Sequence, residues 1–174
     1  ASHQVSAQFY EPLYSFHYLK RPYEMVPLLA AAMPEFSEDR KKITIKLKRG
    51  VHFHDDPCFS DGKGRELNAD DVIYTIARTC TPKTRSELYG AFEDRLIGAK
   101  EFFTGKAQNI SGLRKVDGYT LELSLSFPYP RFIFVFADNK TAIVPKECVQ
   151  KYGDDFRNRA VGTGPFILKE ANLA

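Results

Sequence analysis

The most regular pattern along the chain is an alternation of apolar and polar residues over positions 119–127. Side chains alternate between the two faces of a strand, so this pattern predicts a strand with one buried face. Asp117-Gly118 directly before it is a hairpin turn signal, which predicts pairing with a strand at 113–116. The apolar positions are Tyr119, Leu121, Leu123, Leu125 and Phe127.

A second alternating segment covers positions 43–48, where Ile43, Ile45 and Leu47 share one face and polar residues occupy the other. It predicts another half-buried strand. The apolar face resumes after Gly50, and a polar, glycine-bearing loop follows from Asp55 to Glu66. The chain therefore contains at least two strands that each offer one face to a common core.

Helical periodicity begins after this loop. Asn68 can cap a helix, and two aspartates in the first turn complement the positive end of the helix dipole. Apolar residues at helical spacing predict a buried stripe that Pro82 ends. The stripe consists of Val72, Ile73, Ile76 and Cys80.

Weaker patterns predict the remaining elements. Proline in the first turn and Gly153 as a stop favour a helix over 145–152. The other expectations are an extended segment at 10–14, a helical turn at 28–33, helical pieces around 93–103, a short apolar helix at 130–137 packed in the core, a brief buried strand at 142–144, and a glycine turn at 161–166 leading into a strand at 166–169.

Composition narrows the class of protein. The chain has 174 residues, 43% of them hydrophobic and 27% charged, which is typical of one globular domain. The formal net charge of +3 is too small to favour nucleic acid as a partner. A basic cluster at 40–49 could bind an anion, but such clusters are more often a solvated strand face.

The cysteine pattern excludes two kinds of site. Cys58, Cys80 and Cys148 are widely spaced and form no CxxC pair, so a zinc ribbon or a thioredoxin-type centre is excluded. One disulfide is compatible with the count, and the sequence does not assign it.

The first residues lack the features of a signal peptide. Either the protein is cytosolic or its leader is missing, and the resemblance described below favours a missing leader.

Other chemistry is weakly supported. The histidines at 52 and 54, with Asp55, Asp56 and Cys58, could bind zinc, but a strand end without a metal is the preferred interpretation. The turn at 162–165 lacks the Gly-Lys-Ser/Thr ending of a phosphate-binding loop. No Gly-x-Ser-x-Gly elbow occurs in the sequence. We therefore expect no metal, no cofactor and no catalysis.

Five short stretches occur in an order that resembles the family 5 extracellular solute-binding proteins, the peptide- and nickel-binding receptors of ABC importers. Together they span most of the chain, although the loop at 56–66 is longer than the family's usual link. The stretches are Tyr-Glu-Pro-Leu-Tyr at 10–14, Leu-Lys-Arg-Gly-Val-His-Phe-His-Asp at 47–55, Asn-Ala-Asp-Asp-Val-Ile-Tyr-Thr-Ile-Ala-Arg at 68–78, Val-Asp-Gly-Tyr-Thr-Leu-Glu-Leu at 116–123 and Val-Gly-Thr-Gly-Pro-Phe at 161–166.

The resemblance implies a type II periplasmic-binding-protein fold, in which a ligand is trapped between two lobes and delivered to a membrane permease. The matched stretches belong to the first lobe. Residues 1–174 are therefore expected to form a single fragment of that lobe, an α/β unit with a mixed sheet, with the second lobe absent. The implied location is periplasmic or at the cell surface, as a secreted protein or lipoprotein whose signal peptide is missing here.

The resemblance also implies a binding site. In peptide-binding relatives the stretch at 10–14 can present an acid to the cleft, so Glu11 is a candidate partner for a basic group of the ligand. Tyr10 and Tyr14 could wall the cleft. The alternatives are a solvated glutamate and core tyrosines.

The expected ligand is an oligopeptide or other small solute, bound by a monomer that works with an ABC permease. A ligand-sensing domain of a regulator and a small hydrolase are the rival functions.

Overall fold

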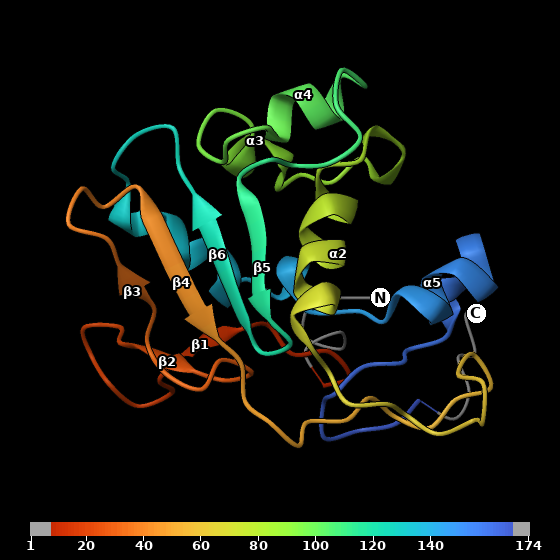
Figure 1. Ribbon diagram of the computed structural model, residues 1–174. Coiled ribbons are helices and arrows are strands. Elements are labelled where there is room, and N and C mark those ends of the chain that lie inside the picture. Colours follow the sequence, from red (N-terminus) through yellow and green to blue (C-terminus); the bar gives the residue numbers. More distant parts are fainter. Residues whose placement is uncertain (1–7, 169–174) are drawn as a thin grey trace.

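The main sheet of the molecule has four strands in the order β3-β4-β6-β5. It is seen in a computed structural model that describes residues 8–168 (Figure 1). Helices and strands are both present, which confirms the α/β class. Every strand pairing within these residues is antiparallel, so this part of the sheet is not mixed. The strands are β3 (Glu35–Phe36), β4 (Lys42–Lys46), β5 (Leu113–Asp117) and β6 (Thr120–Ser124).

The hairpin expected around Asp117-Gly118 is confirmed. β5 and β6 pair with Leu113 opposite Leu123, and the register shifts by one residue near the turn. The other edge of β6 pairs with β4, where Ile43 lies opposite Leu123. Not all of the expected alternation is buried, because β6 ends at Ser124 and Phe127 is 44% exposed.

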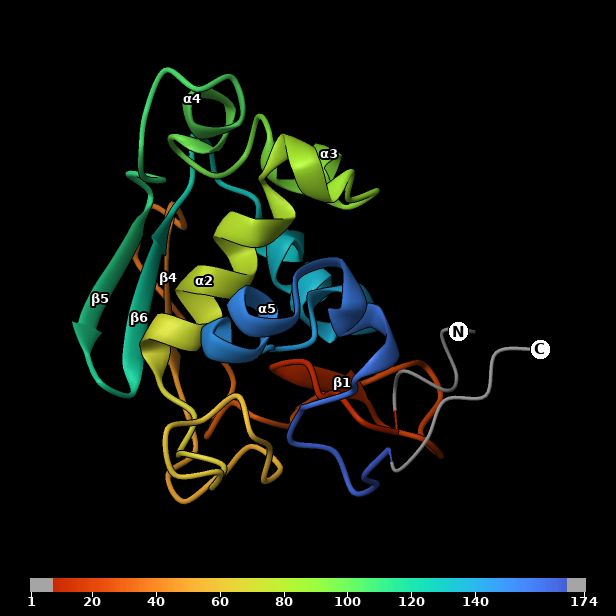
Figure 2. The same ribbon diagram turned by 90° about the vertical axis from the view of Figure 1, so that its right-hand side faces the viewer.

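α2 (Ala69–Thr79) lies against one face of the sheet (Figure 2). Asn68 caps it as expected: its side chain accepts from the backbone N–H of Asp70, and Asp71 accepts from the backbone N–H of Asn68. The expected stripe is buried at Val72, Ile76 and Cys80. Ile73 is only partly buried.

The buried Asp71 also receives two hydrogen bonds from Arg65, at 2.9 and 2.7 Å. Arg65 also donates two hydrogen bonds to Glu147, at 2.6 and 2.8 Å, and so joins α2 to α5 (Lys146–Tyr152). Hydrogen bonding from Arg65 lowers the pKa of Glu147. The polar loop that carries Arg65 is therefore fixed to two helices by charge-assisted bonds.

The helices expected at 130–137 and 145–152 are present, the first as the 3-10 helix η2 (Pro130–Ala137). η2 buries Phe132, Ile133 and Phe136 but leaves Phe134 47% exposed. The chain between 83 and 112 forms only short helices. The remaining helical elements are η1 (Pro82–Thr84), α3 (Tyr89–Phe92), α4 (Ala99–Phe103), η3 (Asn139–Thr141) and η4 (Gly153–Asn158).

Three weaker expectations were wrong. Residues 28–33 form bends rather than a helical turn, because the N–H groups of Leu28 and Ala30 both donate to the carbonyl of Leu13 at 3.0 Å. Residues 142–144 are buried but form no strand. Residues 166–168 form none either, and the last position of that expected strand, 169, lies outside the described residues.

A separate two-stranded sheet begins at the last residue of the 10–14 stretch. It pairs β1 (Tyr14–Phe16) with β2 (Met25–Pro27), and Tyr14 lies opposite Pro27. Among the described residues, no helix has the length and apolar character that crossing a membrane requires.

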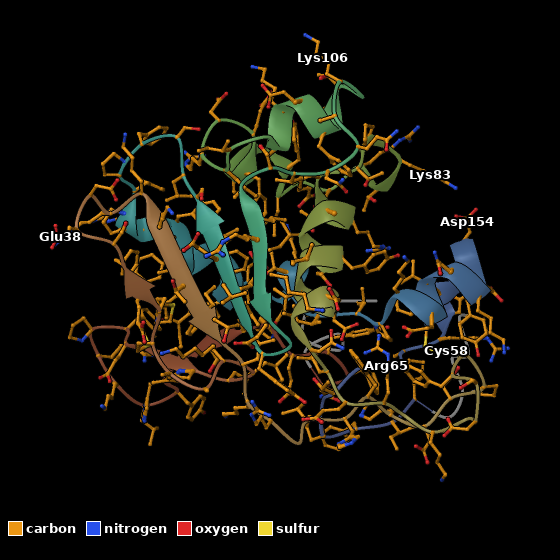
Figure 3. The ribbon with its side chains drawn as sticks, in the orientation of Figure 1. Glu38, Cys58, Arg65, Lys83, Lys106 and Asp154 are labelled. Atoms are coloured by element: carbon orange, nitrogen blue, oxygen red, sulfur yellow. A yellow bond between two sulfur atoms is a disulfide. The ribbon has the colours of Figure 1, made fainter. Side chains whose placement is uncertain are left out.

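A disulfide links Cys58 to Cys148, which the cysteine count alone could not assign. It attaches the 55–66 loop to α5, and Tyr152 donates a hydrogen bond of 2.6 Å to Asp56 beside it. Figure 3 shows Cys58 and Arg65 on the side of the molecule where this loop meets α5. Cys80 is free and has no solvent exposure.

The thiols should therefore react in a fixed order. Burial raises the pKa of the Cys80 thiol to about 12, so the native chain should react slowly with a thiol reagent. Denaturation without reductant should release one thiol, and reduction should release all three cysteines. Rapid reaction of Cys80 in the native chain would contradict its place in the helix stripe.

Candidate ligand-binding site

The glycine turn at 162–165 packs directly against the segment that carries Glu11. The N–H of Gly164 donates to the carbonyl of Phe9 at 2.9 Å. A Cβ at Gly162 would lie 2.1 Å from that same carbonyl oxygen, so a larger residue could not approach. The two glycines of the Gly-Thr-Gly sequence thus allow the turn to pack closely against the backbone of Phe9.

Glu11 is held in place by this turn. Its carboxylate accepts a hydrogen bond of 2.8 Å from the hydroxyl of Thr163. Its carbonyl accepts another of 3.0 Å from the N–H of Ile143. Glu11 is partly buried, and within residues 8–168 it forms no ion pair with a lysine, arginine or histidine. The carboxylate therefore has capacity to bind a cation.

A hollow of about 340 Å³ lies beside this carboxylate. Its walls combine apolar side chains with a carboxylate, hydroxyls and one amide, so they offer both apolar contact and hydrogen-bonding groups. The lining residues are Tyr10, Glu11, Pro12, Ser15, Phe16, Leu28, Ala137, Asn139 and Pro165.

The two candidate tyrosines occupy different environments. Tyr10 lines the hollow, and its hydroxyl oxygen lies 3.5 Å from the carbonyl oxygen of Arg159. Burial raises the pKa of Tyr10 to about 12, so the hydroxyl stays neutral near pH 7. Tyr14 has no solvent exposure and donates to the carbonyl of Ala32 at 3.3 Å. Its position favours the alternative of a core residue.

Sequence reasoning missed Thr163, Phe16 and Asn139. The signal for Thr163 was present, because it is the polar residue between two glycines whose close packing fixes the turn. Phe16 is 44% exposed and lies 6.1 Å, between ring centroids, from Phe134. Exposed aromatic rings thus border the hollow.

The histidines at 52 and 54 do not converge on a common point. His52 Nδ1 contacts the carbonyl of Gly50 at 3.2 Å, whereas His54 Nε2 contacts that of Gly164 at 2.6 Å. The metal-type cluster found among the described residues is Asp56 with Cys58 and Cys148, and the disulfide occupies both sulfurs.

Comparison with known proteins identifies the family. The family described as bacterial extracellular solute-binding proteins, family 5, middle region, matches residues 24–173. The chain belongs to this family.

Individual relatives of known name agree with this family assignment. The chain is 34% identical over 154 residues to the dipeptide-binding protein of Escherichia coli (strain K12), covering 84% of this chain and 27% of that protein. It is 28% identical over 171 residues to the glutathione-binding protein GsiB of Salmonella choleraesuis (strain SC-B67), covering 98% of this chain and 28% of that protein.

A periplasmic oligopeptide-binding protein of Borrelia burgdorferi superposes with a TM-score of 0.80 at 27% identity, covering 99% of this chain and 33% of that chain. The architecture is that of one lobe of these binding proteins. The chain thus spans just over a quarter of the length of the curated relatives and about a third of the solved structure.

Proposed function

We propose that residues 1–174 form the first-lobe segment of a solute-binding protein that captures an oligopeptide or another small solute without chemistry. The observation that carries this proposal is the partly buried Glu11 carboxylate, held by Thr163 at the edge of a hollow and without a cation partner in residues 8–168. Membership of the family supports it.

In this proposal Glu11 binds an amine or a basic side chain of the solute by a charge-assisted hydrogen bond. Tyr10 contributes an apolar wall. Thr163 fixes the carboxylate so that little side-chain freedom is lost when the solute binds. A second lobe closes over the ligand and supplies the remaining contacts, while a peptide backbone can be held by strand-like hydrogen bonds.

The proposed location is the periplasm or the cell surface, where the protein acts as a monomer and delivers its solute to an ABC permease. The family description supports an extracellular place. The Cys58–Cys148 disulfide supports it independently, because disulfides persist in oxidising compartments.

Glu11→Gln tests the site in the complete protein that contains this segment. Affinity for basic peptides should fall by about tenfold or more, since a hydrogen bond to a charged group contributes roughly 1.5–3 kcal/mol. Neutral peptides should lose much less. Titration calorimetry with matched lysine- and norleucine-containing peptides measures both.

Glu38→Gln is the matched control, because Glu38 is exposed and does not line the hollow; Figure 3 shows it at the left edge of the molecule. It should leave both affinities unchanged. An equal loss for basic and neutral peptides in Glu11→Gln would return Glu11 to the role of a solvated glutamate.

A further inference from the structure

A second and larger hollow lies on the outer face of α2. Its volume is about 750 Å³, within the range of small-molecule sites, and none of its lining residues belongs to the hollow beside Glu11. It is bounded by α2, by residues 108–115 and by the starts of α5 and η4. The solute site described above makes no use of it.

The floor of this hollow is apolar. Ile73 belongs to the predicted helix stripe but is partly exposed, because its side chain faces this hollow rather than the sheet. Partly buried Tyr74 and Ala77 of the same helix continue the floor. The other apolar contributors are Phe102, Ile110, Leu113 and Val149.

The rim is basic. Arg78, Lys83, Lys115 and Lys146 line it, against the single carboxylate of Asp154. Lys115 already pairs with Asp70 at the outer edge. The other three cations form no ion pair with any carboxylate in residues 8–168. Figure 3 shows Lys83 and Asp154 projecting on this open side of the molecule.

We propose that this hollow binds an organic anion that joins an apolar body to a carboxylate or sulfonate group. The apolar body would cover the floor and remove its surface from water. The anionic group would lie at the rim, between Arg78 at the end of α2 and Lys146 at the start of α5. Neither a neutral apolar molecule nor an inorganic anion matches both features. This site is independent of the proposed solute site.

A titration of the full chain with three eight-carbon probes tests the proposal. Octanoate, octylammonium and octanamide share one apolar body and differ in the charge of the head group. Octanoate should bind most tightly, and its affinity should fall as salt is added. Backbone NMR signals of 73–78 and 146–149 should shift, whereas those around Glu11 should not.

Charge variants locate the anion. Lys83→Gln combined with Lys146→Gln should weaken octanoate binding about tenfold, because charge-assisted contacts are lost, without changing the fold, since both side chains are exposed. Lys41→Gln is the matched control, because Lys41 is exposed, lies in the turn between β3 and β4 and does not line the hollow.

Three results would overturn the proposal. The first is equal binding of octanoate and octylammonium, which would indicate contact with the apolar floor alone. The second is octanoate binding that the double variant leaves unchanged. The third is the absence of any octanoate-induced shift at 73–78, which would show that the hollow does not take an organic anion.

Discussion

Replacing Leu123 with aspartate should unfold the chain or leave it close to unfolding. Leu123 has no solvent exposure and lies in the centre of the sheet, paired with Ile43 on one side and Leu113 on the other. The substitution removes apolar burial and places a charge without a partner in the core. We expect a loss of several kcal/mol, against a total stability of about 5–15 kcal/mol for a typical domain.

Denaturant unfolding followed by circular dichroism measures this loss. Ser126→Asp is the matched control, because it introduces the same side chain three residues further along at an exposed position. It should change stability by no more than about 0.5 kcal/mol. An unchanged unfolding midpoint for Leu123→Asp would contradict the burial of β6 between β4 and β5.

The elements that sequence could predict are those with strong local signals. The β5–β6 hairpin follows from alternation and a two-residue turn, and α2 follows from a cap, acidic first-turn residues and a periodic stripe. Each signal acts between residues close in the chain. That is why the strand pairing and the Asn68 cap were predicted correctly.

The failures have long-range causes. The 28–33 segment lost its expected helical turn because its N–H groups bond to Leu13 and Lys46 rather than to one another. Phe127 was expected in the core, but the strand ends before it. The pairing of Cys58 with Cys148 joins positions 90 residues apart, and three cysteines allow several pairings.

In the candidate site, too, local features could be predicted from the sequence and long-range contacts could not. Glu11 and Tyr10 could be named from the resemblance of the 10–14 stretch, and the structure places both beside one hollow. The contact between Thr163 and Glu11 could not be foreseen, because the two residues are 152 positions apart and only the packed glycine turn brings them together. Tyr14 belongs to the same stretch but is buried in the core, where its hydroxyl donates to the carbonyl of Ala32, a residue 18 positions away.

The largest functional effect should come from the second lobe. A ligand held in a cleft is buried from both sides, and the solute site proposed for this segment is the small hollow beside Glu11. Each tenfold in affinity corresponds to about 1.4 kcal/mol, so losing half of a micromolar binding energy moves a site to the millimolar range or weaker. The isolated chain should therefore bind peptides at best weakly, whereas a protein that continues into a second lobe should bind them tightly.

Titration calorimetry of a mixed peptide library against residues 1–174 and against the complete protein, side by side, tests directly whether this chain is one lobe of a solute receptor. We expect heat of binding at micromolar peptide with the complete protein and none at that concentration with residues 1–174. Tight peptide binding by residues 1–174 alone would contradict the shared cleft, and hydrolysis of the peptides by the complete protein would contradict a receptor without chemistry.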